Sequence, residues 1–564
     1  MKRTFHPNKR CEDNEKNRMG HFEKSFVLTL KQNFNGKIKM NEAISKNIKR
    51  EHEEQGFVLI VAIIIMALLL LLVVPFLTQM STEHRSSERS SKSMVTLSLA
   101  EAGIERAIWE LNHGDILSWS GDDNLRTLTL SDFQTSNGKV MGDIAISITD
   151  PEGDNPVIEA TGSVTLGSQT VSRIVRVELQ YDSPIPAPTN AINIYGSPSK
   201  HATMKILEHD KKNDGEIVIS GFDAGRGSNR LALGVGDADT LDAIINDLGK
   251  HLKKGGDLED TLIGNPVNTY TDKNGNTFTA SVGQVDTKGF DADLMEEYAK
   301  ILADNARSLA RTQTIDLGGE EKDDAILDPD GDGYVRLGSH EDDVTYVTNG
   351  KLKLEKGLVI EGTGTLVIDG GKLDLKHATF DWDGDIYILG NEKKGDAQFK
   401  VRHASVDITG DIFLLGSDNG KVKMDLHNDD GKNDGYTKIK GSILAMGGTG
   451  DKSKAEFKAH HGDLDIEGFI TMCGTKIKLD IFQQAPHFGK NDIRIEGGIC
   501  LLVPEAKKEK KEKAEIMLHA RGGGEGDFVI QYNSDIVKAA VKRLGQKVGL
   551  PPKYNVVSWQ ETHN

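Results

Sequence analysis

The feature that most constrains this chain is an uninterrupted apolar run near its N-terminal end. No residue from Phe57 to Leu77 is charged, and a helix of that length rises about 30 Å, roughly the thickness of the hydrocarbon core of a bilayer. A secretory signal would have a shorter apolar region of about 7 to 15 residues and a small-residue cleavage site. The stretch "VVPFLTQMSTEHR" offers no such site. The run therefore predicts a membrane-spanning helix.

The charges that flank the run indicate its orientation. Lys46, Lys49 and Arg50 precede it, with Lys37 and Lys39 further back, whereas Arg85, Arg89 and Lys92 follow it. Positive residues close to a span favour the cytoplasmic side of the membrane. We therefore expect a single pass with a cytoplasmic N-terminus.

The helical pattern continues beyond the apolar run. Apolar residues recur three, four and seven positions apart, with charged residues between them; they are Leu97, Ala100, Ile104, Ala107, Ile108 and Leu111. We expect one helix over residues 57–112, kinked at Pro75, where proline removes a backbone donor. The alternating segments "GDIAISITD" and "VSRIVRVELQ" predict a small antiparallel β domain over residues 113–185.

Residues 50–180 resemble the N-terminal domain of PilX-type minor pilins and type IV pilus assembly proteins. The resemblance rests on "QGFVLIVAIIIMALLLLLVVPFL" followed by "SLAEAGIERAIWELN". It implies that a prepilin peptidase cuts after Gly56 and that Phe57 becomes the N-methylated first residue. It also implies that the helix packs against other pilins or pseudopilins in a filament. A membrane anchor that is never cleaved is the alternative.

Two features depart from the pattern of major pilins. The fifth position after the predicted cleavage is Val61, where major pilins carry a Glu that neutralises the terminal amine of a neighbouring subunit. In this respect the chain is similar to the tip pseudopilin of type II secretion systems. The leader over residues 1–56 would also be long, and a start at Met40 would leave residues 1–39 untranslated. We expect no structure for that segment.

The C-terminal half contains a repeat. Six segments share a Gly at the fourth position and an aliphatic residue two positions later; they are "EGTGTLVIDG", "DWDGDIYILG", "DITGDIFLLG", "KIKGSILAMG", "DIEGFITMCG" and "RIEGGICLLV". Their glycines lie 20 to 31 residues apart, an interval typical of one coil of a parallel β-solenoid. We expect this solenoid over residues 351–532, followed by a helix and strand cap over residues 533–564. An antiparallel β-sandwich is the alternative.

The repeat also predicts which side chains face inward and where the cysteines lie. We expect two inward stacks, Leu366–Ile386–Ile412–Ile443–Ile470–Ile499 and Ile368–Ile388–Leu414–Ala445–Met472–Leu501. Cys473 and Cys500 then lie on adjacent coils, two residues out of line. Their Cα atoms would be roughly 8 Å apart, beyond comfortable disulfide reach, so we expect free, buried thiols.

Residues 187–561 resemble, more loosely, the β-solenoid domain that often follows PilX-type N-termini, and bactofilin-like polymer-forming domains have similar repeats. The matching segments are "EIVISGFDA", the "GDIYILG" repeats and "NVVSWQE". Ahead of the repeat, residues 186–350 predict a mixed α/β region. It contains a hairpin centred on Asn274 and Gly275 and a helix with Asp291 or Asp293 as N-cap.

One segment of this middle region could hold a metal. In "DPDGDGY", Asp328, Asp330 and Asp332 occupy positions 1, 3 and 5 of an EF-hand-type calcium loop, and Tyr334 offers its backbone carbonyl. The twelfth position is Ser339 instead of a bidentate Glu, so an acidic residue at 341–343 would have to substitute. Calcium is the one cofactor that we expect, and a solvated acidic turn is the alternative.

Composition and motifs weigh against two other functions. A net charge of -17 argues against a nucleic-acid partner, because phosphate binding needs clustered Lys and Arg. Catalysis on a polysaccharide would need carboxylates on neighbouring coils. Asp374, Asp381, Asp383 and Asp407 are candidates, but nothing in the sequence distinguishes them from ordinary turn residues. We therefore expect no catalytic residues.

These observations predict a mainly β protein with a long N-terminal α-helix: a pilin-like stem with a small antiparallel sheet, a mixed α/β middle region and a C-terminal parallel β-solenoid. We expect a non-enzymatic minor or tip subunit of a type IV pilus or related secretion filament, involved in pilus assembly or surface adhesion. It would reside in the inner (cytoplasmic) membrane and then on the cell surface or pilus. Its partners would be other pilins, prepilin peptidase, the membrane and a surface or glycan ligand. The alternatives are a permanently anchored surface protein with a polymer-forming or ligand-binding solenoid, and a polysaccharide-active enzyme.

Overall fold

The computed structural model describes most of the chain from residue 55 to residue 563. The described residues are 55–113, 116–122, 124–134, 140–151, 153, 155–166, 169–183, 185, 187–196, 198, 201–209, 217–224, 230–251, 258–286, 291–317, 321–322, 332–348, 351–354, 357–390, 395–427, 435–460, 463–483, 492–504, 512–521, 526–550 and 553–563. The chain divides into a smaller unit, residues 1–96 with 164–172, and a larger unit, residues 97–163 with 173–564.

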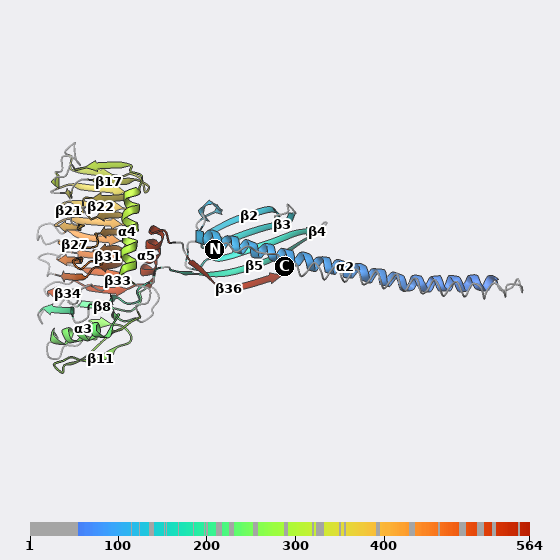
Figure 1. The fold of residues 1–564 in the computed structure, drawn as a ribbon, viewed down its shortest axis with the longest axis horizontal. Coiled ribbons are helices and arrows are strands. Elements are labelled where there is room, and N and C mark those ends of the chain that lie inside the picture. Colours follow the sequence, from blue (N-terminus) through green and yellow to red (C-terminus); the bar gives the residue numbers. More distant parts are fainter. Residues whose placement is uncertain are drawn as a thin grey trace. The chain divides into compact units, whose positions relative to one another are not determined.

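The smaller unit contains the first part of one long helix, α2 (Gln55–His113) (Figure 1). The helix is continuous through Pro75. Next to this proline, the hydroxyl of Thr78 donates to the carbonyl oxygens of Val74 (2.5 Å) and Pro75 (3.0 Å). A side-chain hydroxyl bonding back one turn is a common feature of bent helices. The predicted helix over residues 57–112 forms as a single element, and the kink at Pro75 stays a prediction.

A small antiparallel sheet of six strands belongs to the larger unit, except for residues 164–172, which belong to the smaller unit (Figure 1). In hydrogen-bonded order the strands are β1 (Ser120–Gly121), β2 (Leu125–Gln134), β3 (Val140–Thr149), β4 (Val157–Leu166), β5 (Gln169–Asp182) and β36 (Lys553–His563). A short 3-10 helix, η1 (Ile116–Ser118), leads into β1. The predicted apolar faces of β3 and β5 are buried; they contain Ile144, Ile146, Ile148, Val175, Val177 and Leu179.

The C-terminal turns of α2 pack on this sheet. Ala100 and Ile104 are fully buried, as their helical spacing predicts. Gly103 lies at the closest approach, because a Cβ atom there would be 2.8 Å from the side chain of Ile144 and 3.0 Å from that of Ala160. A larger residue would push the helix away from the sheet.

The C-terminal strand is not part of a solenoid cap, so that part of the prediction for residues 533–564 is wrong. β36 pairs antiparallel with β5, placing Tyr554 opposite Tyr181 and Trp559 opposite Val177. Because β5 leads into the solenoid and β36 follows it, the solenoid is inserted between two neighbouring strands of the small sheet. The alternating pattern of β36 identifies a strand, but strand pairing is non-local and leaves no trace in that pattern.

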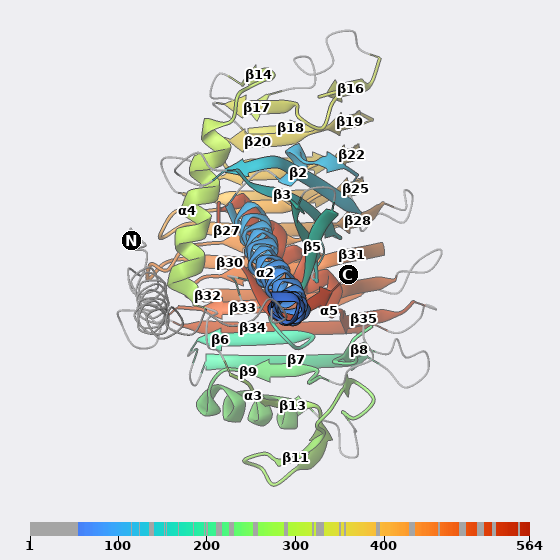
Figure 2. The same ribbon diagram turned by 90° about the vertical axis from the view of Figure 1, so that its right-hand side faces the viewer.

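The solenoid has three strands per coil, and all its neighbouring coils pair in parallel (Figures 1 and 2). This excludes the antiparallel sandwich. We name its three faces the helix-covered face, the nine-stranded face and the third face. The nine-stranded face contains β15 (Glu321–Lys322), β18 (Lys351–Leu354), β21 (Lys372–Lys376), β24 (Ala397–Arg402), β27 (Lys421–His427), β30 (Lys454–His460), β32 (Lys476–Gln483), β34 (Lys513–Arg521) and β7 (Ala202–His209).

The other two faces share two long strands, β31 (Asp463–Cys473) and β33 (Ile493–Val503), which turn a corner. The helix-covered face contains the second halves of these strands and β14 (Gln313–Asp316), β17 (Val344–Thr348), β20 (Thr365–Asp369), β23 (Ile386–Leu389), β26 (Ile412–Leu415), β29 (Ile443–Met446), β6 (Ile192–Gly196), β9 (Leu233–Val235) and β13 (Val282–Gln284). The third face contains their first halves and β16 (Tyr334–Leu337), β19 (Val359–Thr363), β22 (Thr379–Asp383), β25 (Ser405–Thr409), β28 (Tyr436–Lys440), β35 (Phe528–Tyr532), β8 (Ile217–Ser220) and β10 (Leu262–Ile263).

The chain enters the stack of coils away from its ends. The entry coil, β6–β7–β8, pairs with the last coil, β33–β34–β35. The chain then adds β9, β10 and β13 on the other side of the entry coil. These strands are accompanied by α3 (Ala238–His251) and by a hairpin of β11 (Asn268–Thr271) and β12 (Thr277–Ala280).

Helix α4 (Ala292–Ser308) then runs along the stack to its far end, where β14 starts the long series of coils (Figure 2). The predicted start of the solenoid at residue 351 is therefore wrong, because strands from residue 192 onward belong to it. The early coils lack the glycine repeat and are interrupted by helices, so their sequence suggests a separate mixed α/β region. Two local predictions there are confirmed: the hairpin turns at Gly275, and Asp291 caps α4 by accepting the N–H of Asp293 (3.0 Å).

The predicted inward stacks are confirmed. Every expected neighbour is in direct register from one coil to the next, and both stacks are buried. The repeat glycines lie above one another on successive coils, at the corner where the third face meets the helix-covered face. We name this column the glycine ladder. A Cβ atom on Gly410 would lie 2.1 Å from the carbonyl oxygen of Gly384, and one on Gly441 would lie 2.0 Å from that of Gly410. Gly410 also has a φ of 148°, which L side chains rarely adopt.

The cysteine prediction is also confirmed. Cys473 lies opposite Leu502 and Cys500 opposite Thr471, so the cysteines are one coil apart and two residues out of line. Both are free and buried. Burial raises the pKa of each thiol well above its usual value, so both remain protonated and unreactive.

Candidate functional site

The predicted cleavage site lies at the start of α2. Gly56 and Phe57 are helical, while the side chain of Phe57 and the leader before residue 55 lie outside the described part of the chain. Val61 stands at the fifth position after the predicted cleavage. It has no carboxylate and cannot neutralise an N-terminal amine. Cleavage and methylation therefore remain predictions.

Within the described part of the chain, no protein covers the apolar half of α2. Every residue from 62 to 90 is exposed, including Ile63 at 56%, Leu71 at 72% and Leu72 at 70%. Within the described residues, this helix is long and apolar enough to cross a membrane. An exposed Leu forgoes about 1.5 to 3 kcal/mol relative to a buried one. The stem therefore needs either lipid or other apolar helices around it.

The predicted calcium loop is only partly described. Asp328 and Asp330 lie outside the described residues. The side chain of Asp332 accepts the backbone N–H of Tyr334 (2.8 Å), and the intervening Gly333 has a φ of 83°. This local turn is compatible with a loop of the predicted kind.

Asp343, one of the three acidic residues expected to complete that loop, caps a local turn instead. Asp343 accepts backbone N–H groups of Ser339 (2.7 Å) and His340 (3.0 Å). The hydrogen bond from Ser339 is the main reason why the pKa of Asp343 is lowered. Among the described residues, no group of three or more His, Cys, Asp and Glu side chains is placed to hold a metal. Calcium binding remains a hypothesis.

Three of the four candidate catalytic carboxylates come together on the third face, whereas Asp374 lies apart from them. Asp374 lies on the nine-stranded face, between Lys372 (2.6 Å) and Arg402 (2.8 Å). Asp381 and Asp407 are cross-strand neighbours on the third face, and Asp383 lies two residues along β22. Burial and the neighbouring Asp407 raise the pKa of Asp381.

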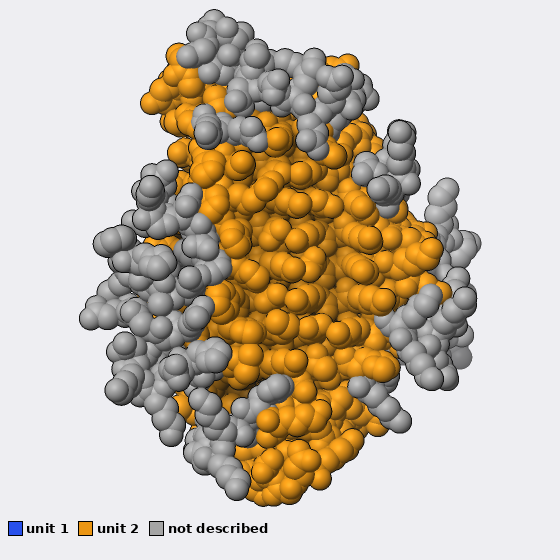
Figure 3. All heavy atoms as spheres, turned by 90° about the vertical axis from the view of Figure 1, so that its left-hand side faces the viewer, with its two compact units in different colours: residues 1–96, 164–172 blue, residues 97–163, 173–564 orange. Residues whose placement is uncertain are grey.

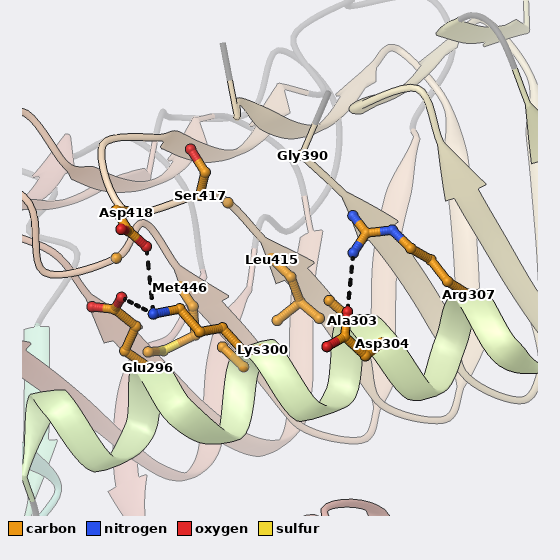
Figure 4. A pocket seen from close by; sticks show the side chains of 13 residues that line it. Glu296, Lys300, Ala303, Asp304, Arg307, Gly390, Leu415, Ser417, Asp418 and Met446 are labelled. Atoms are coloured by element: carbon orange, nitrogen blue, oxygen red, sulfur yellow. Dashed lines mark ion pairs between the residues drawn. The ribbon is translucent and has the colours of Figure 1, made fainter. Parts of the chain in front are cut away.

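A groove of about 300 Å³ separates α4 from the ends of the strands beneath it (Figure 4). The ammonium group of Lys300 lies 2.7 Å from the carboxylate of Glu296 and 3.5 Å from that of Asp418. Glu296 also accepts the backbone N–H of Thr449 (2.8 Å). Burial opposes the ionisation of Glu296, but the bonds from Lys300 and Thr449 outweigh it and lower its pKa. These paired charges clamp α4 onto the coils.

Helix α5 (Ser534–Lys547) is attached to the same face by buried charges. Asp411 is only 4% exposed, and its carboxylate lies 3.1 Å from Arg543 and 2.8 Å from Lys547. Lys547 also contacts Asp385 (2.6 Å). Burial alone would raise the pKa of Asp411, but the positive charge of Lys547 and then Arg543 lowers it. The charged form of Asp411 therefore holds α5 in place.

Sequence analysis missed the outward side of the nine-stranded face. One column contains four exposed lysines in direct register, Lys421–Lys454–Lys476–Lys513. In the next two columns, lysines alternate with acidic or neutral residues; the columns are Lys372–Gln398–Lys423–Glu456–Lys478–Glu515 and Asp374–Lys400–Asp425–Lys458–Asp480–Met517. From β21 to β34, eleven Lys and Arg and five Asp and Glu face outward in the described strands.

A fourth column follows the edge of this face. Its rings are His377, His403, His427, His460, Phe482 and His519, with successive centroids 5.1 to 6.1 Å apart. His460 lies 3.4 Å from Asp480, which also contacts Lys478 (2.9 Å). Burial opposes the ionisation of Asp480, but these two partners hold its pKa well below the usual range.

A sequence signal for these columns exists. The segments "KVKMDLH", "KAEFKAH", "KIKLDIF" and "KAEIMLH" each begin with Lys and end, six residues later, with His or Phe. The pattern becomes visible when the second strands of the coils are aligned instead of the glycine segments. A shared position in each coil places equivalent side chains in one column.

Comparisons with known proteins give little further support. No protein family and no curated protein matches the chain. Among solved structures, the chain is similar to the competence-associated pilin ComZ from Thermus thermophilus at 13% sequence identity and a TM-score of 0.18; the match covers 84% of this chain and 98% of that chain. A likeness at this level does not establish a common family.

Proposed function

We propose that this chain is a minor or tip subunit of a type IV pilus or related secretion filament, of the PilX-type class, and that it carries a β-solenoid. The main observation is the division of α2. Its C-terminal turns are buried on the small sheet, whereas its N-terminal apolar part has no cover in the described chain. Such a stem suits storage in lipid and later packing against the stems of other pilins or pseudopilins.

In this proposal, prepilin peptidase cleaves between Gly56 and Phe57, and Phe57 is methylated. Before assembly, the subunit resides in the cytoplasmic membrane with its N-terminus in the cytoplasm. Its small sheet and the inserted solenoid lie outside, where they serve filament assembly or adhesion at the cell surface. Val61 lacks the charge that major pilins use to pair with a neighbouring amine, which favours a minor or tip position over a repeated one.

We also infer that the subunit has no catalytic role. Asp374 lies on a different face from the other three candidates and is neutralised by Lys372 and Arg402. Asp381 and Asp407 are direct cross-strand neighbours, so they are the pair that would have to supply the two facing carboxyl groups of a retaining or inverting glycosidase. Activity on a panel of polysaccharides would contradict this part of the proposal.

Fractionation of the native host tests the filament role. The wild-type chain is expected in the sheared filament fraction, whereas Gly56→Val, which blocks cleavage, is expected to stay in the membrane pellet. Gln55→Ala, one residue away, is the matched control and should behave like the wild type. Retention of the wild-type chain in the membrane pellet would instead support a permanently anchored surface protein.

Calcium binding by Asp328, Asp330 and Asp332, with the carbonyl of Tyr334, is a separate part of the proposal. A site of this kind stabilises the folded chain by an amount that rises with the logarithm of the free metal concentration once that concentration exceeds the Kd. Added calcium should raise the melting temperature of the wild type, and Asp330→Asn should abolish this increase. An identical calcium response in both proteins would rule out the site.

A further inference from the structure

We propose that the nine-stranded face of the solenoid binds an acidic polysaccharide, a sugar polymer that carries carboxylate groups, along its lysine columns. This goes beyond the filament role and does not depend on it, because the face is complete within the solenoid. The observations that support the proposal are the charge of the face, its repeat and the mixture of groups that it presents.

The charge of the face is opposite to that of the whole chain. The protein carries a net charge of -17, yet basic residues outnumber acidic ones about two to one on the outward side of β21 to β34. The side of the solenoid where β21, β27 and β34 are labelled in Figure 1 faces the viewer in Figure 3, where side chains form regular rows across an open surface. A local basic surface on an acidic protein attracts polyanions selectively to that surface.

The repeat of the face suits an extended polymer. Successive lysines of one column stand on neighbouring coils, about 4.8 Å apart. Lys421 and Lys513 therefore mark the ends of a row that spans four strands. Sites for small molecules are concave, whereas this surface is an open sheet face. A chain with regularly repeated charges can engage several lysines at once, and such multivalent contact strengthens weak individual contacts.

The mixture of groups favours a sugar over a nucleic acid. Asp425, Glu456 and Glu515 lie among the lysines, and their side chains are 27%, 30% and 22% exposed. Carboxylates accept hydrogen bonds, so they can bind the hydroxyl groups that every sugar unit offers. The backbone of duplex DNA has no hydroxyl groups to donate to these carboxylates, so they would meet only its negative charge. An acidic polysaccharide offers both the hydroxyl donors and the negative charges that this surface matches.

The full-length chain in detergent micelles, with immobilised polygalacturonate as the probe, provides the test. The column variant replaces four lysines by Gln: Lys421→Gln, Lys454→Gln, Lys476→Gln and Lys513→Gln. The matched control makes the same change at four exposed lysines elsewhere: Lys250→Gln, Lys273→Gln, Lys440→Gln and Lys538→Gln. The two variants have equal net charge, and their melting temperatures check that both are folded.

The column variant should bind polygalacturonate at least about tenfold more weakly than the wild type, and the control should change by less than about twofold, because only the column contributes direct contacts. Added salt should weaken the wild type more than the column variant. Equal losses in the two variants, or no binding by the wild type, would overturn the proposal. Duplex DNA binding as tightly as polygalacturonate would overturn the choice of a sugar polymer. Neutral dextran binding as tightly would overturn the role of charge.

Discussion

The helix-covered face and the nine-stranded face belong to the same coils but present opposite surfaces. Strands such as β23, β26 and β29 are buried at every position. Strands such as β27 and β30 alternate between buried and half-exposed residues. The inward residues are apolar in both cases, so the faces differ only in what lies outside them.

This difference shows that the outward side chains of a face indicate whether a helix covers that face. Phe413 and Leu444 point away from the solenoid interior yet are 3% and 4% exposed, because α5 lies over them in a contact that also includes Val541 and Leu544. On the nine-stranded face, the equivalent outward positions hold lysines and their acidic partners. Continuous apolar strands thus indicate cover on both sides, and alternating ones indicate a free side.

The largest expected effect comes from disrupting the glycine ladder, because the stacking of the coils, and so of both faces, depends on it. Gly410→Val would place a Cβ atom 2.1 Å from the carbonyl oxygen of Gly384 and should destabilise the solenoid by more than about 4 kcal/mol or prevent its folding. Gly549→Ala is the control, because its φ of 72° is also positive but nothing lies within 4 Å of the added atom. It should cost about 1 to 2 kcal/mol. Similar urea midpoints for the two variants would refute the glycine ladder.

The next largest effect comes from making the same change, Phe to Ala, at one position on each face. Phe413→Ala removes a buried ring that stacks on Tyr387 at 4.6 Å and should cost about 3 to 5 kcal/mol. Phe482→Ala, on the nine-stranded face, removes a half-buried ring and should cost about 1 kcal/mol. Thermal unfolding followed by circular dichroism provides the comparison. If Phe482→Ala were the more damaging variant, the assignment of covered and open faces would be wrong.

A smaller effect concerns the charges that attach α5 to its face. Asp411→Asn should destabilise the chain by about 2 to 4 kcal/mol, because Arg543 and Lys547 lose a buried partner. The lowered pKa of Asp411 means that its contribution is complete above about pH 4, the usual pKa of Asp, and is lost as the pH falls through the lowered value. The difference between the urea midpoints of the wild type and the variant should therefore be constant from pH 7 to about pH 4 and should shrink as the pH falls further. A difference that stays constant below about pH 4 would show that the charge of Asp411 is not involved.

The smallest effect is expected on the open face. Lys423→Ala removes contacts with Asp425 (2.7 Å) and Glu456 (3.9 Å), but the lysine side chain is 24% exposed. Pairs in such positions contribute about 0 to 1 kcal/mol. The melting temperature should change little, and less in high salt. A loss as large as that of Phe413→Ala would mean that the charged columns support the fold and are not free to bind a partner.

Much of the coil geometry could be predicted from the sequence because it is local and repeated. The glycine segments predict the register of both inward stacks, from Leu366 to Leu501, and the separation of Cys473 from Cys500. Each of these follows from a counted interval between similar segments, and the backbone pairs confirm them. The helix and the apolar faces of β3 and β5 follow from periodicity in the same way.

The remainder depends on contacts between distant segments. The pairing of β36 with β5 and of β6 with β33 joins residues hundreds of positions apart, and no periodicity reports such pairing. The packing of α4 and α5 on one face does have a signal in the sequence. The segments "IFLL" and "ILAM" are apolar throughout, whereas "KVKMDL" alternates between polar and apolar residues. The candidate calcium residues Asp328 and Asp330 lie outside the described residues, so that prediction awaits experiment.

Mass spectrometry of the N-terminus of the protein purified from its native host tests the proposed function most directly. The proposal predicts a chain that begins at Phe57 with a methyl group on its amine, which would mean cleavage after Gly56 and release of the stem for assembly into a filament. A chain that retains residues ahead of Gly56 would contradict this. The apolar part of α2 would then be a permanent anchor, and the solenoid would belong to a protein that stays in the membrane.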